Sequence, residues 1–142
     1  MWVIVHAISG LALGTLVEAP LWVVVLAALV LHVLLDLVPH WDYTRSSRRV
    51  LWVALDLGGA IVLTLLVWRG AGLPTRALVA AVVSALPDLD VIQAVLPLRR
   101  ARALFPSHWR AFPHGSCAQA PGIAVQASVV AVSLAAVAVW GK

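Results

Sequence analysis

Residues 21–42 read LWVVVLAALVLHVLLDLVPHWD, and this stretch decides what kind of fold the chain can adopt. Residues 21–38 are apolar apart from His32 and Asp36, and Pro39 ends the run. A run of this length is typical of a helix that crosses a membrane, because the hydrocarbon core takes about 20 residues. Ionisable side chains are costly in that environment, so His32 and Asp36 are candidate functional residues.

The composition of the whole chain supports a membrane environment. The chain has 142 residues, of which 63% are hydrophobic and 11% are charged, whereas a soluble domain carries about 25% charged residues. The mean hydropathy is +1.00. These values exclude a water-soluble globular domain and a disordered chain, and the length favours a single domain.

Four more apolar runs occupy residues 2–17, 50–67, 75–86 and 123–140. None alternates with a period of two, so we expect helices rather than strands. The sequence predicts an all-α integral membrane protein, residues 1–142, with about five transmembrane or partly re-entrant helices; runs 2–17 and 75–86 are short for a full span. Gly10 and Gly14 form a GxxxG pattern, which predicts close packing of the first helix against a neighbour.

The arginines predict how the helices are oriented. Nine of the ten basic residues are Arg, and seven of these lie in the loops at 39–49 and 87–122. The positive-inside rule places the N-terminus and both loops in the cytoplasm, in a multi-pass protein of the inner (plasma) membrane. Basic loops beside apolar spans report orientation, so we expect the lipid bilayer as a partner and no nucleic acid.

Two parts of the chain, approximately residues 1–42 and 50–90, resemble each other. Each has a Trp followed four positions later by a ligand-type residue, His6 in the first part and Asp56 in the second. Each then ends in Pro-His/Asp-x-Asp, at residues 39–42 and 87–90. We expect an internal duplication of a two-helix unit, followed by a cytoplasmic loop at 87–122 and a final helix at 123–140. Chance similarity between two apolar hairpins is the alternative.

The scarce polar residues converge on one side of this topology. His32 and Asp36 are four residues apart, so they share a helix face. All five His and all five Asp are expected at the cytoplasmic end, where Pro39 and Pro87 stop their helices and turn the following residues inward. Imidazole and carboxylate together favour a site for one or two divalent ions, Zn first, with Mn or Fe as alternatives. The predicted metal ligands are His6, His32, Asp36, His40, Asp42, Asp56, Asp88 and Asp90.

Two of these residues have structural alternatives. Asp42 precedes Tyr43 and Thr44, so it is equally interpreted as a solvated loop acid or a helix cap. For His6 alone, a packed core histidine is an alternative. Asp36 and Asp56 lie inside apolar runs, where a carboxyl group needs a partner or a proton.

Three motifs resemble those of a bacterial inner-membrane family, the predicted membrane-bound metal-dependent hydrolases. The motifs are LPDLD at 86–90, SHWRAFPHGS at 107–116, and an early helix with His6 followed by Gly10 and Gly14. The family pairs an L-P-D-x-D turn with a later H-R-G-x-T-H-S stretch. In this chain the two later histidines are six residues apart instead of five, and Pro113 stands where the family has Thr.

The resemblance implies a metal-dependent hydrolase whose site includes Asp88, Asp90, His108 and His114. Together with the residue pattern it predicts hydrolysis of a phosphoester or lipid-like substrate at the cytoplasmic membrane interface. His108 and His114 would ligate a metal or protonate a leaving group. Arg110, with Arg99 and Arg100, would hold a phosphate. The alternatives are a non-catalytic metal-binding membrane protein with a structural or regulatory role, and a divalent-metal transporter.

Overall fold

The computed structural model describes residues 1–90, 92, 105–109 and 111–141, and the regular structure in these residues is entirely helical. The α-helices are α1 (Val3–Leu16), α2 (Leu21–Leu37), α3 (Arg49–Gly70), α4 (Thr75–Ala85) and α6 (Gln119–Trp140). Three short 3-10 turns complete the described elements: η1 (Tyr43–Arg45), η2 (Leu86–Asp88) and η3 (Pro106–His108). Each apolar run forms one α-helix, so the predicted all-α class is confirmed.

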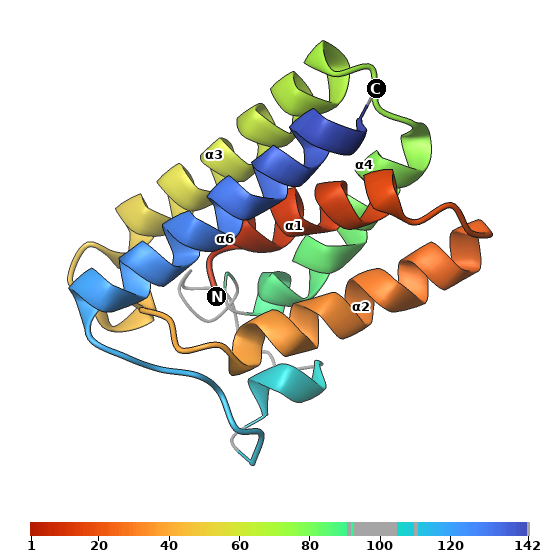
Figure 1. The fold of residues 1–142 in the computed structure, drawn as a ribbon. Helices are drawn as coiled ribbons and strands as arrows, with labels where there is room; N and C mark the ends of the chain where they lie inside the picture. Colours follow the sequence, from red (N-terminus) through yellow and green to blue (C-terminus); the bar gives the residue numbers. More distant parts are fainter. Residues whose placement is uncertain (91, 93–104, 110, 142) are drawn as a thin grey trace.

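Helix α1 lies at the centre of the bundle and contacts α2, α3, α4 and α6 (Figure 1). Its contact with α4 is a backbone contact made through glycines. A Cβ atom on Gly10 would come within 2.5 Å of the carbonyl oxygen of Ala80, and one on Gly14 within 2.6 Å of the Cα of Ala77. The close packing predicted from the GxxxG pattern is therefore confirmed.

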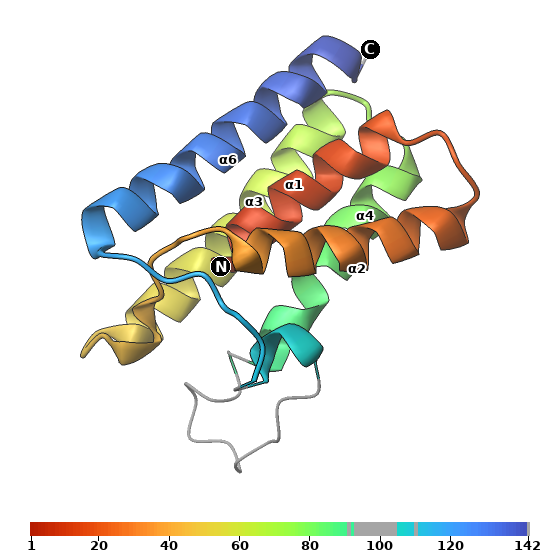
Figure 2. The same ribbon diagram turned by 60° about the horizontal axis from the view of Figure 1, so that its bottom comes forward.

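The two prolines end their helices as predicted. Helix α2 ends at Leu37, before Pro39, and α4 ends at Ala85, after which Pro87 lies in η2. The turns place His40 and Asp88 in the interior, each about 1% exposed. The N-terminus, the carboxyl end of α2 and η3 lie at the same end of the bundle (Figures 1 and 2). The main-chain N–H of Trp2 donates there to Gln126 of α6 at 2.9 Å.

Helix α2 buries two ionisable side chains and exposes an apolar face. Its buried stripe, spaced by four residues, consists of Val24, Ala28, His32 and Asp36. Its exposed stripe, also spaced by four residues, consists of Trp22, Leu26, Val30 and Leu34. A helix of a water-soluble protein has the reverse arrangement, with the polar face outward.

Two helices in the described part of the chain, α3 and α6, are long and apolar enough to cross a membrane. Helices α1 and α2 are apolar but have 14 and 17 residues, and α4 has 11. Full-length spans are thus fewer than the five predicted. The helices on either side of Pro20 and the helix before Pro87 end too early to cross a membrane at full length. The duplication of a two-helix unit stays a prediction.

Replacing Gly14 with Val is expected to lower the free energy of unfolding by about 1–3 kcal/mol, because the added side chain meets backbone of α4 that has no room to move. Thermal unfolding of the detergent-solubilised protein, followed by circular dichroism, measures the change. Gly58→Ala on α3 is the control, since no atom lies within 4 Å of its added Cβ. An unchanged melting temperature for Gly14→Val would contradict the packing.

Candidate metal centre

Five of the predicted site residues form one buried group, which we call the inner cluster. Its members are His6 of α1, His32 and Asp36 of α2, Asp88 of η2 and His108 of η3. No side chain in the cluster is more than 7% exposed. Four elements far apart in sequence therefore bring two carboxylates and three imidazoles into one enclosed space.

The inner cluster contains two overlapping sets of three possible ligands, His6, His32 and Asp36 in one and His32, Asp88 and His108 in the other. Nε2 of His32 lies 3.0 Å from Asp36 Oδ2, and Nε2 of His6 lies 3.3 Å from Asp36 Oδ1. Three further contacts measure 3.6 Å, from His6 to Asp88 and from His108 to both carboxylates. Ligands bound about 2.0–2.1 Å from a tetrahedral ion lie about 3.3 Å apart. The donor set is also the one that zinc prefers.

A backbone contact orients the imidazole of His32. Its Nδ1 lies 2.7 Å from the carbonyl oxygen of Ser84, and this oxygen only accepts hydrogen bonds, so Nδ1 carries the proton. In the neutral ring the lone pair of Nε2 then faces the carboxylate of Asp36. Second-shell contacts of this kind hold metal-ligating histidines. Two acceptors that face each other require a cation or a proton between them.

Several atoms of the inner cluster have no hydrogen-bond partner among the described residues. They are both ring nitrogens of His6 and of His108, Nε2 of His32, Oδ2 of Asp36 and both carboxylate oxygens of Asp88. Buried polar groups are normally paired, because an unpaired one costs several kcal/mol of desolvation. A divalent cation held by these atoms satisfies them together, so the residues present fit a metal.

The charges of the cluster also favour a cation. The α-amino group of Met1 is buried 2.7 Å from Asp36 Oδ1 and offsets one carboxylate charge. Asp88 contributes a second carboxylate, which faces the imidazoles of His6 and His108. The single α-amino group offsets one of the two carboxylate charges, and the other is unfavourable in a buried site unless a proton or a cation compensates it.

Asp90 lies behind His108 rather than among the facing ligand atoms. Its Oδ2 accepts the main-chain N–H of Phe105 at 2.8 Å and lies 3.5 Å from Nδ1 of His108. A carboxylate on the far nitrogen of an imidazole orients the ring. Burial opposes protonation of His108, but the carboxylate of Asp88 outweighs it and raises the pKa of that imidazole.

His40 and His114 form a second group, the outer pair, at the edge of the cluster. Their Nε2 atoms are 3.1 Å apart, and both lie within 4.8 Å of a carboxylate oxygen of Asp36. Nδ1 of His40 lies 2.7 Å from the carbonyl oxygen of Val38 and donates to it. Burial lowers the pKa of His40 to about 4 and also lowers the pKa of His114, so both rings are neutral at pH 7.

Asp56 has structural partners instead of a place in the cluster. Its two oxygens accept the main-chain N–H groups of Val3 and Ile4, each at 2.9 Å, and the hydroxyl of Tyr43 at 2.8 Å. Burial and the Asp56 carboxylate raise the pKa of Tyr43, which keeps this hydroxyl a donor. Asp56, a residue of α3, therefore caps the N-terminus of α1, because the first N–H groups of a helix lack partners within the helix. It is not retained as a metal ligand.

Asp42 is also separate from the cluster. Its side chain is exposed and accepts the main-chain N–H of Thr44 at 2.7 Å, which caps η1. This agrees with its interpretation as a loop cap, so it is not retained as a ligand either. Arg110, Arg99 and Arg100 lie outside the described residues.

Ser84 contributes to the site although it was not expected from the sequence. It is fully buried, its carbonyl oxygen holds His32, and its side chain lies against Gly10. Every residue type has a main-chain carbonyl oxygen, so the sequence does not reveal this contact. The only available signal was a hydroxyl residue in the alanine-rich run before Pro87.

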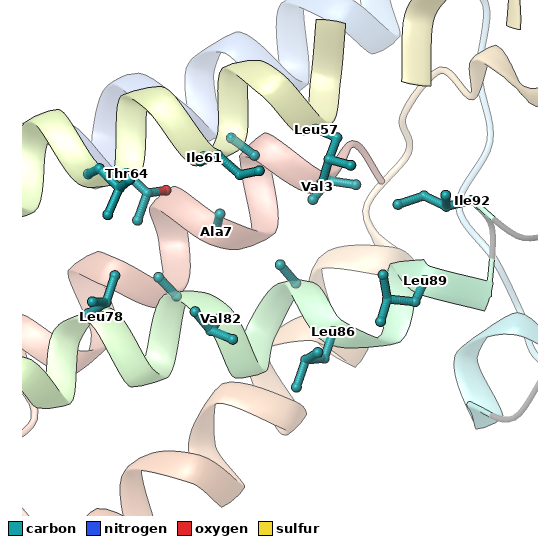
Figure 3. A pocket seen from close by; sticks show the side chains of 14 residues that line it. Val3, Ala7, Leu57, Ile61, Thr64, Leu78, Val82, Leu86, Leu89 and Ile92 are labelled. Atoms are coloured by element: carbon teal, nitrogen blue, oxygen red, sulfur yellow. The ribbon is translucent and has the colours of Figure 1, made fainter. Parts of the chain in front are cut away.

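An apolar groove lies between α1, α3 and α4 (Figure 3). Its volume is about 250 Å³, and Thr64 is the polar residue among those that line it. Leu89 and Ile92 lie at one end and Thr64 and Leu78 at the other (Figure 3). Leu89, at one end of the groove, directly follows Asp88 in the sequence. A second apolar groove, about 460 Å³, lies between α1, α2 and α6.

Comparisons with known proteins give no identification. No known family matches the chain, and no curated protein or solved structure matches it either. The resemblance to membrane-bound metal-dependent hydrolases stays a prediction.

Asp56→Asn is expected to lower the melting temperature while leaving the metal content unchanged. The amide keeps one acceptor oxygen but places an NH₂ group against an N–H donor of α1. Loss of a helix cap costs about 0.5–2 kcal/mol. Circular dichroism and elemental analysis of the same sample measure both quantities. Loss of metal with an unchanged melting temperature would show that Asp56 is a metal ligand and not a helix cap.

Proposed function

We propose that this chain is a membrane-embedded, metal-dependent hydrolase acting on a phosphoester with an apolar tail at the cytoplasmic face of the inner membrane. The inner cluster would hold the divalent ion, zinc first. One observation carries the proposal: buried imidazole nitrogens and carboxylate oxygens from four elements face one another at 3.0–3.6 Å, and all of these atoms except Asp36 Oδ1, which accepts from the α-amino group of Met1, lack a hydrogen-bond partner among the described residues.

The distribution of apolar side chains supports the membrane setting. Only 22% of the apolar window in α3 and in α6 is buried, whereas the core helix of a soluble protein is mostly buried. Neither helix is near the N-terminus, so a signal sequence does not account for them. The apolar outer stripe of α2 continues this surface. We therefore place the protein in the bilayer as a multi-pass protein, with the arginine-rich loops in the cytoplasm.

Each residue has a role that follows from its position. His6, His32, Asp36 and Asp88 would hold the metal, which when bound acts as a Lewis acid and activates water. Asp90 orients His108, which is the least enclosed imidazole of the inner cluster.

The solvent-exposed outer imidazole has a separate role. His114 is exposed and neutral, and the neutral imidazole is the form that ligates a metal or accepts a proton from an attacking water.

The groove in Figure 3 supports a substrate with an aliphatic tail. It is apolar along its length, and one end lies at Leu86 and Leu89, on either side of Asp88 in the chain. A tail in this groove would bring a polar head to the level of the metal. Burial of each methylene group would contribute about 0.8 kcal/mol of binding free energy.

The non-catalytic metal protein is the second candidate, and the enclosure of the inner cluster favours it. Structural metal sites are closed, whereas catalytic sites keep a position open for water or substrate. No comparable observation supports transport: transport sites lie near the middle of the bilayer, whereas the N-terminus, the carboxyl end of α2 and η3, from which most of the cluster comes, lie at one end of the bundle (Figure 1).

Asp36→Asn is expected to remove most of the bound metal, because Asp36 contacts His6, His32 and His108. Elemental analysis of the detergent-purified protein, with circular dichroism to confirm folding, measures this. Asp42→Asn is the matched control and should keep the wild-type metal content, since Asp42 lies on an exposed turn.

The same preparations separate the two candidate functions. Metal-dependent release of phosphate or alcohol from long-chain phosphoesters in micelles supports the hydrolase. Wild-type protein that holds its metal but hydrolyses none of them is the non-catalytic protein. Wild-type protein without any metal would refute both.

Val82→Trp is expected to lower kcat/KM at least about tenfold for a long-chain phosphoester, since the indole occupies the groove and displaces two or more methylenes. Activity on a short, water-soluble phosphoester should not change. Val62→Trp is the control, because Val62 has a similar exposure, 58% against 52%, and does not line the groove. If Val132→Trp in the second groove lowers the activity instead, the tail lies there.

A further inference from the structure

We infer that Asp36 bridges two metal sites, and that the outer site, formed by Asp36, His40 and His114, holds the ion that a substrate reaches. This inference rests on the proposed function, because it assigns the second ion to the same centre. The ion expected in the outer site is a divalent ion such as zinc, because two imidazoles and one carboxylate are side chains that bind such ions.

The outer pair has the geometry of two ligands on one ion. The Nε2 atoms of His40 and His114 are 3.1 Å apart, near the spacing of about 3.3 Å between tetrahedral ligands. The Nδ1–H of His40 donates to the carbonyl oxygen of Val38, so the lone pair of Nε2 faces His114. A carboxylate oxygen of Asp36 completes a set within 4.8 Å.

The loop that carries His114 is fastened to the carboxyl end of α2. The main-chain N–H of Gly115 donates to the carbonyl oxygen of Asp36 at 2.8 Å, and that of Cys117 donates to the carbonyl oxygen of His40 at 3.0 Å. A Cβ atom on Gly115 would lie 2.4 Å from the carbonyl oxygen of Val38, so this approach requires glycine. The backbone therefore presents His114 to His40 before any ion binds.

The two sites differ in their access to solvent. The inner cluster is enclosed, with side chains at most 7% exposed, as in a structural site. The outer site has three protein ligands, and His114 is exposed. Three protein ligands and an open side are typical of a catalytic ion. Asp36 contacts the inner cluster and belongs to the outer set, and a shared carboxylate is how protein sites hold two ions close together.

The test measures the number of ions per chain and does not depend on activity. Detergent-purified wild-type protein, loaded with Zn²⁺ and desalted, is expected to hold two ions by elemental analysis. His114→Ala is expected to hold one, and this exposed loop substitution leaves the helices intact. Gly115→Ala is expected to lose the same ion through displacement of the loop. Cys117→Ala, the control in the same loop, should keep two, because its contact with His40 is made by the main chain.

Loading with Co²⁺ gives an independent readout, since two ions that share a carboxylate are magnetically coupled and the coupling should vanish in His114→Ala. A wild-type protein with one ion, lost in Asp36→Asn but kept in His114→Ala, would overturn the inference and leave the proposed function standing. In that case His114 simply donates a hydrogen bond to His40. A wild-type protein with no ion would overturn both.

Discussion

The carboxylate of Asp36 is the group on which the rest of the site depends. It is fully buried near the end of an apolar helix, where an uncompensated charge would be very costly. Three imidazoles from α1, α2 and η3 lie within 3.0–3.6 Å of it. The site thus exists because three elements supply imidazole partners to a charge that the surrounding apolar side chains do not stabilise.

The central helix makes this convergence geometrically possible. Because Gly10 and Gly14 let α1 touch the backbone of α4, His6 on α1 reaches Asp88 just beyond α4. The N-terminus of α1 is fastened by Asp56 of α3 through two main-chain hydrogen bonds. Asp56 therefore stabilises the start of the helix that carries His6.

Helix α2 exposes an apolar stripe and buries two ionisable side chains. Along α2, Trp22, Leu26, Val30 and Leu34 face outward while His32 and Asp36 face inward. In water this arrangement would expose a long apolar stripe, which is unfavourable. In a bilayer the stripe is solvated by lipid, and the interior is the only place where polar groups find partners.

Much of the site was predictable because polar residues are so rare in the chain. The spacing of His32 and Asp36 indicated one helix face, and Pro87 indicated that Asp88 would turn inward. The repeat misled at Asp56: its match to His6 suggested an equivalent ligand, yet Asp56 lies opposite the free N–H groups of α1 and binds these instead. A helix end offers the same attraction to a carboxylate as a metal site does, and sequence does not distinguish them.

The sequence by itself determined the helical class, the helix ends at the prolines and the identity of the candidate ligands. These follow from local properties, namely run length, periodicity and the backbone restrictions of proline and glycine. Only the tertiary structure decided which residues share the inner cluster, which form the outer pair, and which act as caps. Those distinctions depend on contacts between residues as far apart as His40 and His114, which are set by the packing of helices and by main-chain hydrogen bonds available to any residue type.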